Sequence, residues 1–537
     1  MMPGKVVTAE EAVRAINSGD TITISGVVGS LVPEKVLASL EERFLKEGEP
    51  RNLTVFCPVA VGDVFDLPGM DHLAHEGMTR RFIAGSYVIG TSPKTGQTAA
   101  VTRMILENKV EAYNLPLGVL QHLLREIAAG RPGVITKAGL GTFVDPRLEG
   151  GKMNALTTED LVELVNLGGE EYLWYKSFPV HVAIIRGTTA DEDGNITMEH
   201  EGTVAAALAQ AMAAHNAGGK VIAQVKRLAA RGSLHPQMVK IPGVLVDYIV
   251  VDPYQVQATG VAFDPSVCGE VRAPLAALRR DVPFDAEKVI ARRALLELQQ
   301  GETVILGFGA PSLLPSIALE EGIADRFHFT VEHGSIGGIP LAGFQFGVNA
   351  NPAAIIDSPS HFDYINGGGF DVACLAFAEV DPHGSVNVSK LPKLIPGCGG
   401  FIEITHRSRH IVFCGFFTAS GLKVTVADGR LHIVQEGRHV KFVQRLFQTT
   451  FDGKQARRKG QRVSFITERG VFELRDSGLV LTEVAPGIDI ERDIAGRMQF
   501  PLQVSPDLRE MDARLFRPEP MGLIPQSAPL LESTVGA

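Results

Sequence analysis

Several features that mark common protein classes are missing from this sequence of 537 residues. Its five cysteines form no C-x-x-C pair, which fits a reducing compartment and argues against a structural zinc site. The net charge is -10, whereas nucleic-acid binding usually needs a basic face. No apolar run of about 18 residues predicts a membrane span, and the first residues lack the pattern of a secretory signal. We therefore expect a cytoplasmic protein that binds neither nucleic acid nor membrane.

Motifs for nucleotides and metals are also missing. The sequence has no G-x-G-x-x-G fingerprint and no G-x-x-x-x-G-K-[ST] loop, which argues against a dinucleotide site and a P-loop ATPase. Four histidines of the second half show no H-x-x-x-H spacing among themselves, so we expect no bound metal there; they are His328, His333, His361 and His383. The basic run "ARRKGQR", residues 456–462, is interpreted as a solvated loop, with contact to the phosphates of a soluble ligand as the alternative.

Apolar strands that alternate with amphipathic helices dominate the remaining sequence. The segment Asp20–Gly26 predicts a strand that ends in glycine, and Pro33–Gly48 predicts a helix with one apolar stripe. This alternation is typical of α/β proteins with mainly parallel sheets and helices on both faces.

An internal repeat explains the length of the chain. The segments that begin near Thr8 and Asp285 share one order: helix, acidic turn, strand, glycine turn, Pro-containing helix start. A second echo links residues 184–198 with 375–388. Chance similarity between two βα units is the alternative, but the shared order favours duplication. We predict two similar open α/β domains, residues 1–280 and 281–515, with a boundary in 272–287 and an irregular tail, 516–537.

Glu332 stands where a predicted strand meets a glycine-rich loop, in "FHFTVEHGSIGGIP". Parallel strands deliver their carboxyl ends to the ligand crevice, where a carboxylate can act as base, nucleophile or ligand. Gly334, Gly337 and Gly338 carry no side chain, so a substrate or a second chain segment can come close. A solvated glutamate at a strand end is the simpler alternative.

Three glycine turns offer backbone N–H groups. "SGVVGSLVP" (25–33) and "GFGAPSLLP" (307–315) each lie between a strand and a helix, which suits an anion or a plain tight turn. "PGCGGFIEI" (396–404) is predicted as a compact loop before a strand, whose paired glycines could form an oxyanion hole or a bulged turn. We expect Cys398 in this loop to be an inert buried thiol rather than a nucleophile.

Together these segments resemble family I coenzyme A transferases, in particular the acetate/propionate branch with both halves fused in one chain. The resemblance covers nearly the whole sequence apart from its last stretch. Five ordered motifs carry it: "GRPGVITKAGLGTFVDPRLEGGKMN", "IRGTTADEDGNITMEHE", "FTVEHGSIGGIP", "INGGGFDVACLAFAEVDPHGSVNVSKLP" and "PGCGGFIEI".

The resemblance implies a ping-pong reaction in which Glu332 attacks an acyl-CoA and passes through an anhydride to a glutamyl-CoA thioester. The partners would be acyl-CoA and short-chain carboxylic acids, with CoA as a substrate, no cofactor, and a homodimer or homotetramer. Two alternatives stay open at this point. The same glutamate could serve an acyl-CoA hydrolase, or the chain could be a non-enzymatic ligand-binding protein of this general fold.

The resemblance also assigns residues to the site. It places oxyanion stabilisation on Gly400, with Gly399 beside it. The implied acyl or carboxylate pocket comprises Gly26, Val28, Gly29, Leu117 and Gly118. The implied CoA contacts are Gly337, Gly338, Asn349, Gly367 and Gly368. One position departs from the family: Leu117 stands between Pro116 and Gly118, where a glutamine amide is common, and leucine donates no hydrogen bond.

Overall fold

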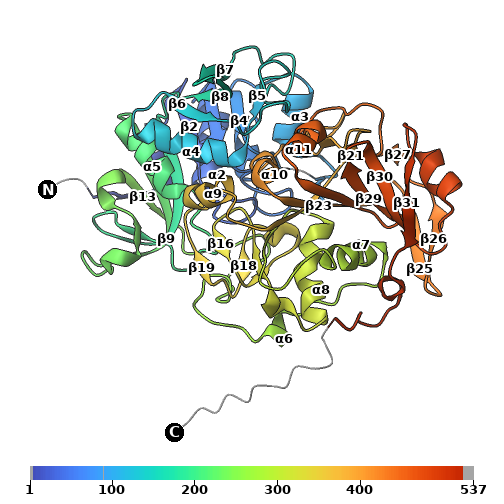
Figure 1. The fold of residues 1–537 in the computed structure, drawn as a ribbon. Coiled ribbons are helices and arrows are strands. Elements are labelled where there is room, and N and C mark those ends of the chain that lie inside the picture. Colours follow the sequence, from blue (N-terminus) through green and yellow to red (C-terminus); the bar gives the residue numbers. More distant parts are fainter. Residues whose placement is uncertain (1–3, 89, 524–537) are drawn as a thin grey trace, which may run out of the picture.

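The computed structural model describes residues 4–88 and 90–523, and each half of the chain builds a ten-stranded sheet (Figure 1). The path of the first sheet is entirely parallel. Its order is β1 (Val6–Val7), β13 (Tyr248–Val251), β11 (Lys220–Ala229), β9 (Val182–Asp191), β2 (Thr21–Ile24), β3 (Leu53–Cys57), β4 (Thr79–Ala84) and β5 (Glu111–Asn114), with β10 (Ile196–Thr197) and β12 (Val239–Ile241) off this path.

The second sheet has a parallel centre and antiparallel flanks, except that the edge strand β31 pairs parallel with β30. Its order is β19 (Ala354–Ile355), β16 (Ser335–Ile336), β15 (His328–Thr330), β14 (Thr303–Leu306), β20 (Val372–Ala376), β23 (His410–Cys414), β28 (Arg462–Ile466), β29 (Gly470–Arg475), β30 (Gly478–Val484) and β31 (Gln503–Glu510).

The two sheets share one strand order, which agrees with the predicted repeat. The run β3-β2-β9-β11-β13 in the first half matches β15-β14-β20-β23-β28 in the second. In the first half, all ten residues of β9 are buried, as expected for a parallel strand covered on both faces. The predicted fold class, two similar open α/β domains, is confirmed.

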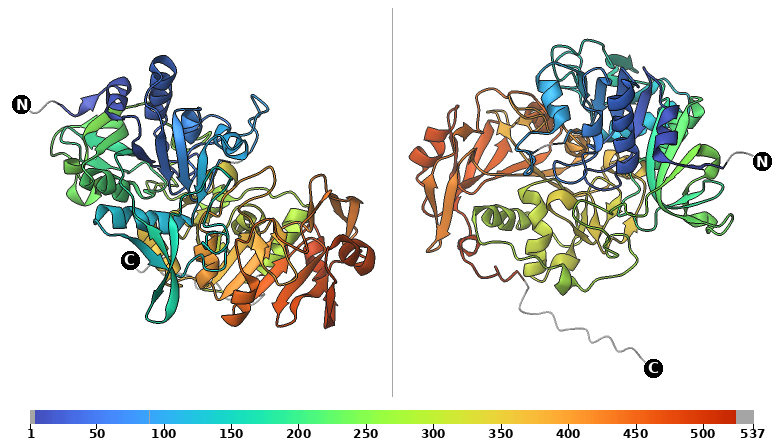
Figure 2. Two further views of the ribbon diagram at one scale, coloured as in Figure 1. Left: turned by 90° about the horizontal axis from the view of Figure 1, so that it is seen from above. Right: turned by 180° about the vertical axis from the view of Figure 1, so that it is seen from behind.

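Helices cover the sheets, and the halves lie side by side in both views of Figure 2. The first half contains α1 (Ala9–Ala12), α2 (Glu34–Glu47), α3 (Ala100–Leu106), α4 (Leu117–Ala128) and α5 (Ala207–Asn216). The second contains α7 (Ala286–Leu295), α8 (Leu314–Glu320), α9 (Ser358–Asn366), α10 (Phe401–Arg407) and α11 (Gly453–Arg458). The helix predicted from Pro33 ends where expected, because Gly48 adopts the left-handed conformation with φ 72°.

Both halves also contain small antiparallel sheets besides the main sheet. The first carries a three-stranded sheet of β6 (Gly133–Thr136), β8 (Glu170–Lys176) and β7 (Val162–Leu167). The second carries the pairs β17 (Ile339–Pro340) with β18 (Asn349–Ala350), β21 (Glu379–Val380) with β22 (Val386–Asn387), β24 (Thr418–Ala419) with β27 (His439–Val440), and β25 (Lys423–Ala427) with β26 (Arg430–Gln435).

One hydrophobic cluster continues from the first half into the second, so the halves pack as one body. Helix α4 of the first half and helix α9 of the second meet at this junction. Arg125 of α4 binds two acidic residues of the second half, Asp357 at 2.8 Å and Asp363 at 2.9 Å. Phe362 of α9 is fully buried in the shared cluster.

One local prediction is wrong. The residues after the glycines of "PGCGGFIEI" form helix α10, not a strand. The β-branched and aromatic residues of this segment favour strands, but tertiary packing overrides that preference. As a helix, the segment buries Phe401, Ile402 and Ile404 together on the junction between the halves.

The predicted boundary, residues 272–287, lies between β13 and β14 and contains the short helix α6 (Leu275–Leu278). The division at residue 280 stays a prediction. The described part of the predicted tail is held by Glu321, whose carboxylate accepts from Met521 N at 2.6 Å and Gly522 N at 2.9 Å. The tail beyond residue 523 lies outside the described residues. Within the described ranges, no helix has the length and apolar character needed to span a bilayer.

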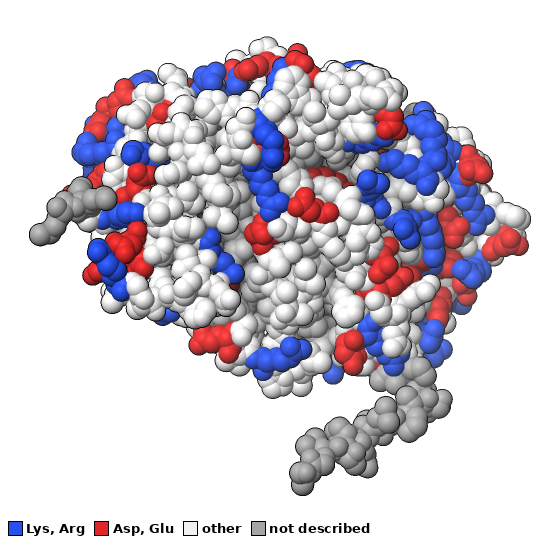
Figure 3. Space-filling model, turned by 60° about the vertical axis from the view of Figure 1, so that its left-hand side comes forward, with Lys and Arg blue, Asp and Glu red and all other residues white. Residues whose placement is uncertain are grey.

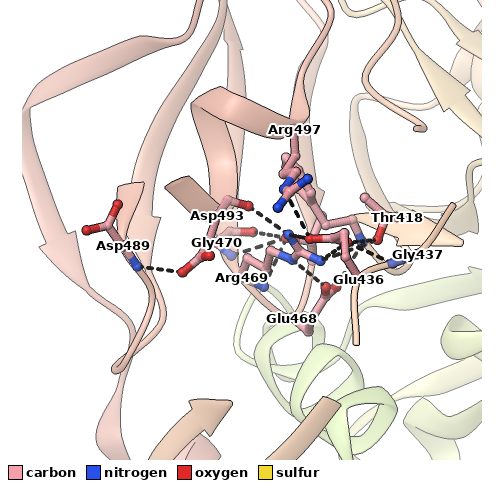
Figure 4. A network of polar contacts seen from close by, with 11 residues as sticks. Thr418, Glu436, Gly437, Glu468, Arg469, Gly470, Asp489, Asp493 and Arg497 are labelled. Carbon is pink, nitrogen blue, oxygen red and sulfur yellow. Dashed lines mark hydrogen bonds and ion pairs between the residues drawn. The ribbon is translucent and has the colours of Figure 1, made fainter. Parts of the chain in front are cut away.

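A buried ion network holds the carboxyl end of the second sheet together (Figure 4). Arg469, whose side chain is 0% exposed, lies between β28 and β29. It pairs with Glu436 at 2.7 Å and Glu468 at 3.0 Å, and it donates to the Asp493 carbonyl at 2.7 Å. Glu468 also accepts from Phe417 N at 2.8 Å. Arg469 and Glu468 together therefore join their own segment to three others, at Phe417, Glu436 and Asp493.

Replacing Arg469 should destabilise the protein strongly. Arg469→Met leaves the buried Glu468 carboxylate without its ion-pair partner and leaves Glu436 with Arg497 alone, at 3.5 Å. Breaking a buried pair from one side costs about 3–5 kcal/mol. The midpoint of urea unfolding, followed by circular dichroism, should fall accordingly. Arg14→Met is the matched control, because its ion pair with Glu47 is exposed and such pairs contribute about 0–1 kcal/mol. Equal midpoints for the two variants would contradict a stabilising role for the network.

Candidate active site

Glu332 lies two residues beyond β15, at the carboxyl end of the parallel strands of the second sheet. Its side chain is only 16% exposed, so the solvated strand-end alternative is wrong. The turn that follows is fixed by a buried histidine, because Gly334 N donates to His361 Nδ1 at 3.1 Å. Burial lowers the pKa of His361 to about 4, so this ring is neutral and can accept that bond.

Gly400 lies directly against the Glu332 carboxylate. Its backbone N–H donates to Glu332 Oε1 at 3.4 Å. A Cβ atom on Gly400 would lie 2.4 Å from Glu332 Oε2 and 3.0 Å from the Phe362 ring, so no larger residue fits here without movement. The structure therefore brings together the two residues that the resemblance pairs as nucleophile and oxyanion donor.

Poor solvation dominates the electrostatics of Glu332. Burial raises its pKa from 4.5 to about 7, and the Gly400 N–H lowers it only in part. His333 Nε2 lies 3.7 Å from Glu332 Oε1 and offers no compensating charge, because burial lowers the His333 pKa to about 3. The carboxylate is thus weakly solvated and unpaired, which makes it a stronger nucleophile than an exposed glutamate.

Backbone hydrogen bonds attach the loop before α10 to the first half of the chain. Tyr87 N donates to Pro396 O at 2.9 Å, and Gly399 N donates to Gly85 O at 2.7 Å. Cys398 N donates to the Asn114 side chain at 2.8 Å. The N–H of Gly399 is therefore already engaged, which leaves Gly400 as the donor that faces Glu332.

Leu117 and Gly118 begin α4 on the other side of this loop. Leu117 is buried and its N–H donates to Gly399 O at 3.0 Å. Gly118 N donates to the Glu403 carboxylate at 2.7 Å. A Cβ atom on Gly118 would lie 2.1 Å from Phe362 Cδ1, so only glycine allows this approach of the two halves. The structure places both predicted residues beside the glycine loop.

Glu403 is a part of this site that the sequence reasoning missed. It is 0% exposed on α10, and its carboxyl group receives N–H donors at the start of α4, which has no side-chain cap of its own. Asn366 Nδ2 donates to its other oxygen at 3.4 Å. Burial raises the Glu403 pKa to about 8, and the charge of Glu332 adds to this. An acidic residue between Ile402 and Ile404 in an otherwise apolar segment was the available signal.

The predicted first-half turn reaches the site through Val27. Val28 has φ 49°, which is strained for a β-branched residue, and it is held by bonds to Ala60 O and Gly62 N. Its neighbours Gly26 and Gly29 pack against Val61 and Thr259 of the same half.

Val27 makes the connection to the second half. A Cβ atom on Gly347 would lie 2.7 Å from Val27 Cγ1 and 3.0 Å from His333 Cδ2. The turn 26–29 therefore faces His333, the residue next to Glu332.

The glycines after Glu332 make room for the protein's own backbone. Cβ atoms on Gly334 and Gly338 would lie 2.1 Å from Ile356 O and 2.3 Å from Ala350 O, respectively. Asn349 is buried, and its Nδ2 donates to Gly337 O at 2.7 Å. Of the two reasons considered for these glycines, close approach of a second chain segment is the one that the structure shows.

Other predicted residues lie farther from Glu332. Gly367 and Gly368 follow the end of α9, where Gly368 faces Arg407 rather than the glycine loop. Burial raises the pKa of the Cys398 thiol well above its ordinary value, which suits an inert side chain. Within the described residues, no group of three or more potential metal ligands comes together.

Comparison with known proteins gives matches over nearly the whole chain. A family model described as coenzyme A transferase matches residues 6–252. Acetate CoA-transferase YdiF of Escherichia coli K12 is 43% identical over 526 residues, which cover 97% of each chain. Caffeate CoA-transferase of Acetobacterium woodii is 45% identical over 520 residues, 95% of this chain and 97% of that one.

Solved structures agree. The apoenzyme of YdiF from Escherichia coli O157:H7 has a TM-score of 0.90 at 42% identity, with 97% of this chain and 98% of that chain covered. A structure of the same protein described as a thioester complex with CoA matches equally well, with a TM-score of 0.90.

Glu403 should make the stability of the protein depend on pH. Its pKa is about 8 in the folded protein and 4.5 ordinarily, so between these values the folded state holds a proton that the unfolded chain has lost. Stability therefore falls as pH rises through this window. Glu403→Gln, which cannot ionise but still offers an acceptor to Gly118 N, should reduce the fall in melting temperature between pH 5 and pH 8.

Glu192→Gln is the control, because the Glu192 side chain is 62% exposed and should leave the pH dependence as in the wild type. Burial raises the pKa of Glu332 as well, so ionisation of Glu332 also lowers stability as pH rises. Part of the fall in melting temperature therefore remains in both variants. A wild-type pH dependence in Glu403→Gln would show that this carboxyl group is not protonated in the folded protein.

Proposed function

The chain belongs to the coenzyme A transferase family and is a CoA-transferase, and we propose that it moves CoA from an acyl-CoA to a free carboxylic acid through a covalent intermediate on Glu332. The observation that carries this proposal is the contact between the Glu332 carboxylate and the Gly400 N–H at 3.4 Å, in a poorly solvated site.

In the first step, ionised Glu332 attacks the thioester carbonyl of acyl-CoA. The C–S bond breaks, CoA leaves as the thiolate, and an acyl-glutamyl anhydride forms. The thiolate then attacks the glutamyl carbonyl and expels the first acid as a carboxylate, which leaves a glutamyl-CoA thioester. An incoming carboxylate reverses these steps and leaves as the new acyl-CoA.

Each residue around Glu332 has a role in this scheme. Gly400 N–H is the donor for the oxygen that becomes negative during each attack. Limited exposure of Glu332 restricts water, which would hydrolyse the anhydride and the thioester. The turn with Gly26, Val28 and Gly29 would line the carboxylate pocket from the first half.

The names of two relatives and the residue at position 117 support the proposed substrate class. The two relatives are named for acetate and caffeate, and the short-chain acids of our prediction include propionate, butyrate and 3-oxoacids. Leu117 makes its side of the glycine loop apolar, which favours acyl groups without a polar end near the carbonyl. CoA contacts at Gly337, Gly338, Asn349, Gly367 and Gly368, and a cytoplasmic homodimer or homotetramer, stay predictions.

Glu332→Gln tests the nucleophile. Because an amide cannot form the anhydride, the rate of CoA transfer should fall by at least about 10³-fold. After wild-type protein is mixed with acyl-CoA, peptide mass spectrometry should find CoA attached at Glu332. Glu192→Gln should keep wild-type activity and form the same adduct. Full activity of Glu332→Gln would refute the mechanism, and turnover without an acceptor acid would indicate a hydrolase.

Leu117→Gln tests the departure from the family. A glutamine amide beside the glycine loop adds one donor, and a single oxyanion donor changes rates by roughly 10²–10³ in other enzymes. We expect kcat to change by at least about tenfold for some acids of a panel from acetate to caffeate, so that acyl preference shifts. Leu117→Met, which keeps the site apolar and its volume similar, should retain the wild-type ranking. Unchanged rates for every acid in Leu117→Gln would exclude a role for this position.

A further inference from the structure

A cavity of about 900 Å³ lies at the junction of the two halves, apart from Glu332. This volume is in the range of pockets that hold small molecules. Three parts of the chain line it: the sheet of β6 and β8, the end of α9 with the end of α10, and the turn after α11. The lining residues that matter are Lys137, Tyr172, Arg407, Arg409, Lys459 and Gln461.

Four cations share this cavity, although the whole chain is acidic. Lys and Arg side chains gather on the right of the face drawn in Figure 3, with Asp and Glu side chains among them. Lys137 is paired with Glu170 at 2.9 Å. Arg407, Arg409 and Lys459 form no ion pair with any residue that the structure describes. The cavity therefore carries a positive charge that its own carboxylates do not balance.

Burial and these cations lower the pKa of a neighbouring histidine, His406. The His406 pKa is lowered to about 3, first by burial and then by the charges of Lys459, Arg407 and Lys137. The Lys459 pKa is lowered as well, by burial and then by Arg407, with Asp452 opposing this shift. Cations that raise one another's energy in this way would be stabilised by a bound anion.

Hydrogen bonds fix the backbone segments that form the floor of the cavity. Gln461 Nε2 donates to Thr405 O at 2.8 Å and to Ser408 O at 2.6 Å. Arg407 Nε donates to Asn366 O at 3.0 Å. Lys459 Nζ lies 3.1 Å from His406 Nδ1. These bonds fix the end of α10 and the turn after α11, and they leave most donors of both arginines free for a ligand.

The cavity is separate from the candidate active site. Gly400 precedes α10 and contacts Glu332, whereas Arg407 ends α10 and lines the cavity. The helix rise of 1.5 Å per residue puts these two residues about 10 Å apart. Arg409 immediately precedes β23 and so lies at its amino end, while Glu332 follows the carboxyl end of β15.

We propose that this cavity binds the phosphate groups of a small soluble molecule, held by Lys137 of the first half and by Arg407, Arg409 and Lys459 of the second. Arginine forks and lysine ammonium groups are the usual partners of multiply charged phosphates. The basic run 456–462 is not the predicted loop, because its first three residues belong to α11 and Arg462 begins β28. Its middle residues, 459–461, line the cavity, which favours the alternative interpretation, contact with phosphates. Because both halves supply ligands, an occupant would also hold them together.

Binding of inorganic tripolyphosphate to the full-length protein tests the site. Calorimetry at low ionic strength should give saturable binding with one site per chain, and the melting temperature should rise with ligand concentration. The double variant Arg409→Gln with Lys459→Gln should weaken binding by at least about tenfold, since two of four cations are removed. Lys454→Gln is the matched control, because Lys454 is an exposed residue of α11 that does not line the cavity.

A competition arm identifies the source of the phosphates. Displacement of tripolyphosphate by desulfo-CoA, which lacks the reactive thiol, would assign the site to the nucleotide phosphates of CoA. Binding that desulfo-CoA leaves unchanged would assign it to a second metabolite, and both results support the site. The proposal is overturned if the wild type shows no saturable binding, or if Lys454→Gln weakens binding as much as the double variant.

Discussion

The line of hydrogen bonds between the glycine loop 396–400 and the first half is the constraint on which the rest of the site depends. Gly399 uses its N–H and its carbonyl for Gly85 and Leu117, and Cys398 N is held by Asn114. These bonds fix the loop so that one N–H, that of Gly400, stays directed at Glu332. A donor positioned in this way needs no reorganisation when charge develops, which is the main source of oxyanion stabilisation. The proposed nucleophile thus belongs to one half, and the donor that faces it is positioned by contacts with the other half.

Two carboxyl groups, those of Glu332 and Glu403, are buried on either side of the glycine loop and have different roles. Glu332 faces the loop with little solvation, so its pKa rises to about 7 and its ionised form is reactive. Glu403 lies behind the loop with a pKa of about 8, and it accepts the N–H groups at the start of α4. The ionised form of each carboxyl group would be more stable in water. The free-energy cost of burying both groups must therefore be offset by the packing of Phe362 and the two helices. Since the charge of Glu332 also raises the Glu403 pKa, ionisation of one group disfavours ionisation of the other.

The sequence predicted the architecture well, because duplication and strand–helix alternation leave a periodic signal. It predicted Glu332 at the end of a strand because alternation stops there, and the structure places the strand end within two residues. It missed the helical state of Phe401–Arg407, whose residues favour strands locally but are buried by long-range contacts. It also missed Glu403, because an acidic residue in an apolar segment does not by itself reveal that it caps α4 from 285 residues away. The glycines after Glu332 were noticed, but which chain segment approaches them is set by tertiary structure.

Duplication itself explains how one fold can build such a site. The strands β3 and β15 hold the same place in the two sheets, yet the chain after β15 carries Glu332, and the chain after β3 carries Ala60, Val61 and Gly62, which support Val28. In the proposed mechanism, one copy therefore supplies the reactive carboxylate, and the other supplies the turn 26–29 that faces the residue next to it. Divided roles of this kind need a fixed junction, and the bonds of the glycine loop, Arg125 of α4 and the shared hydrophobic cluster provide it.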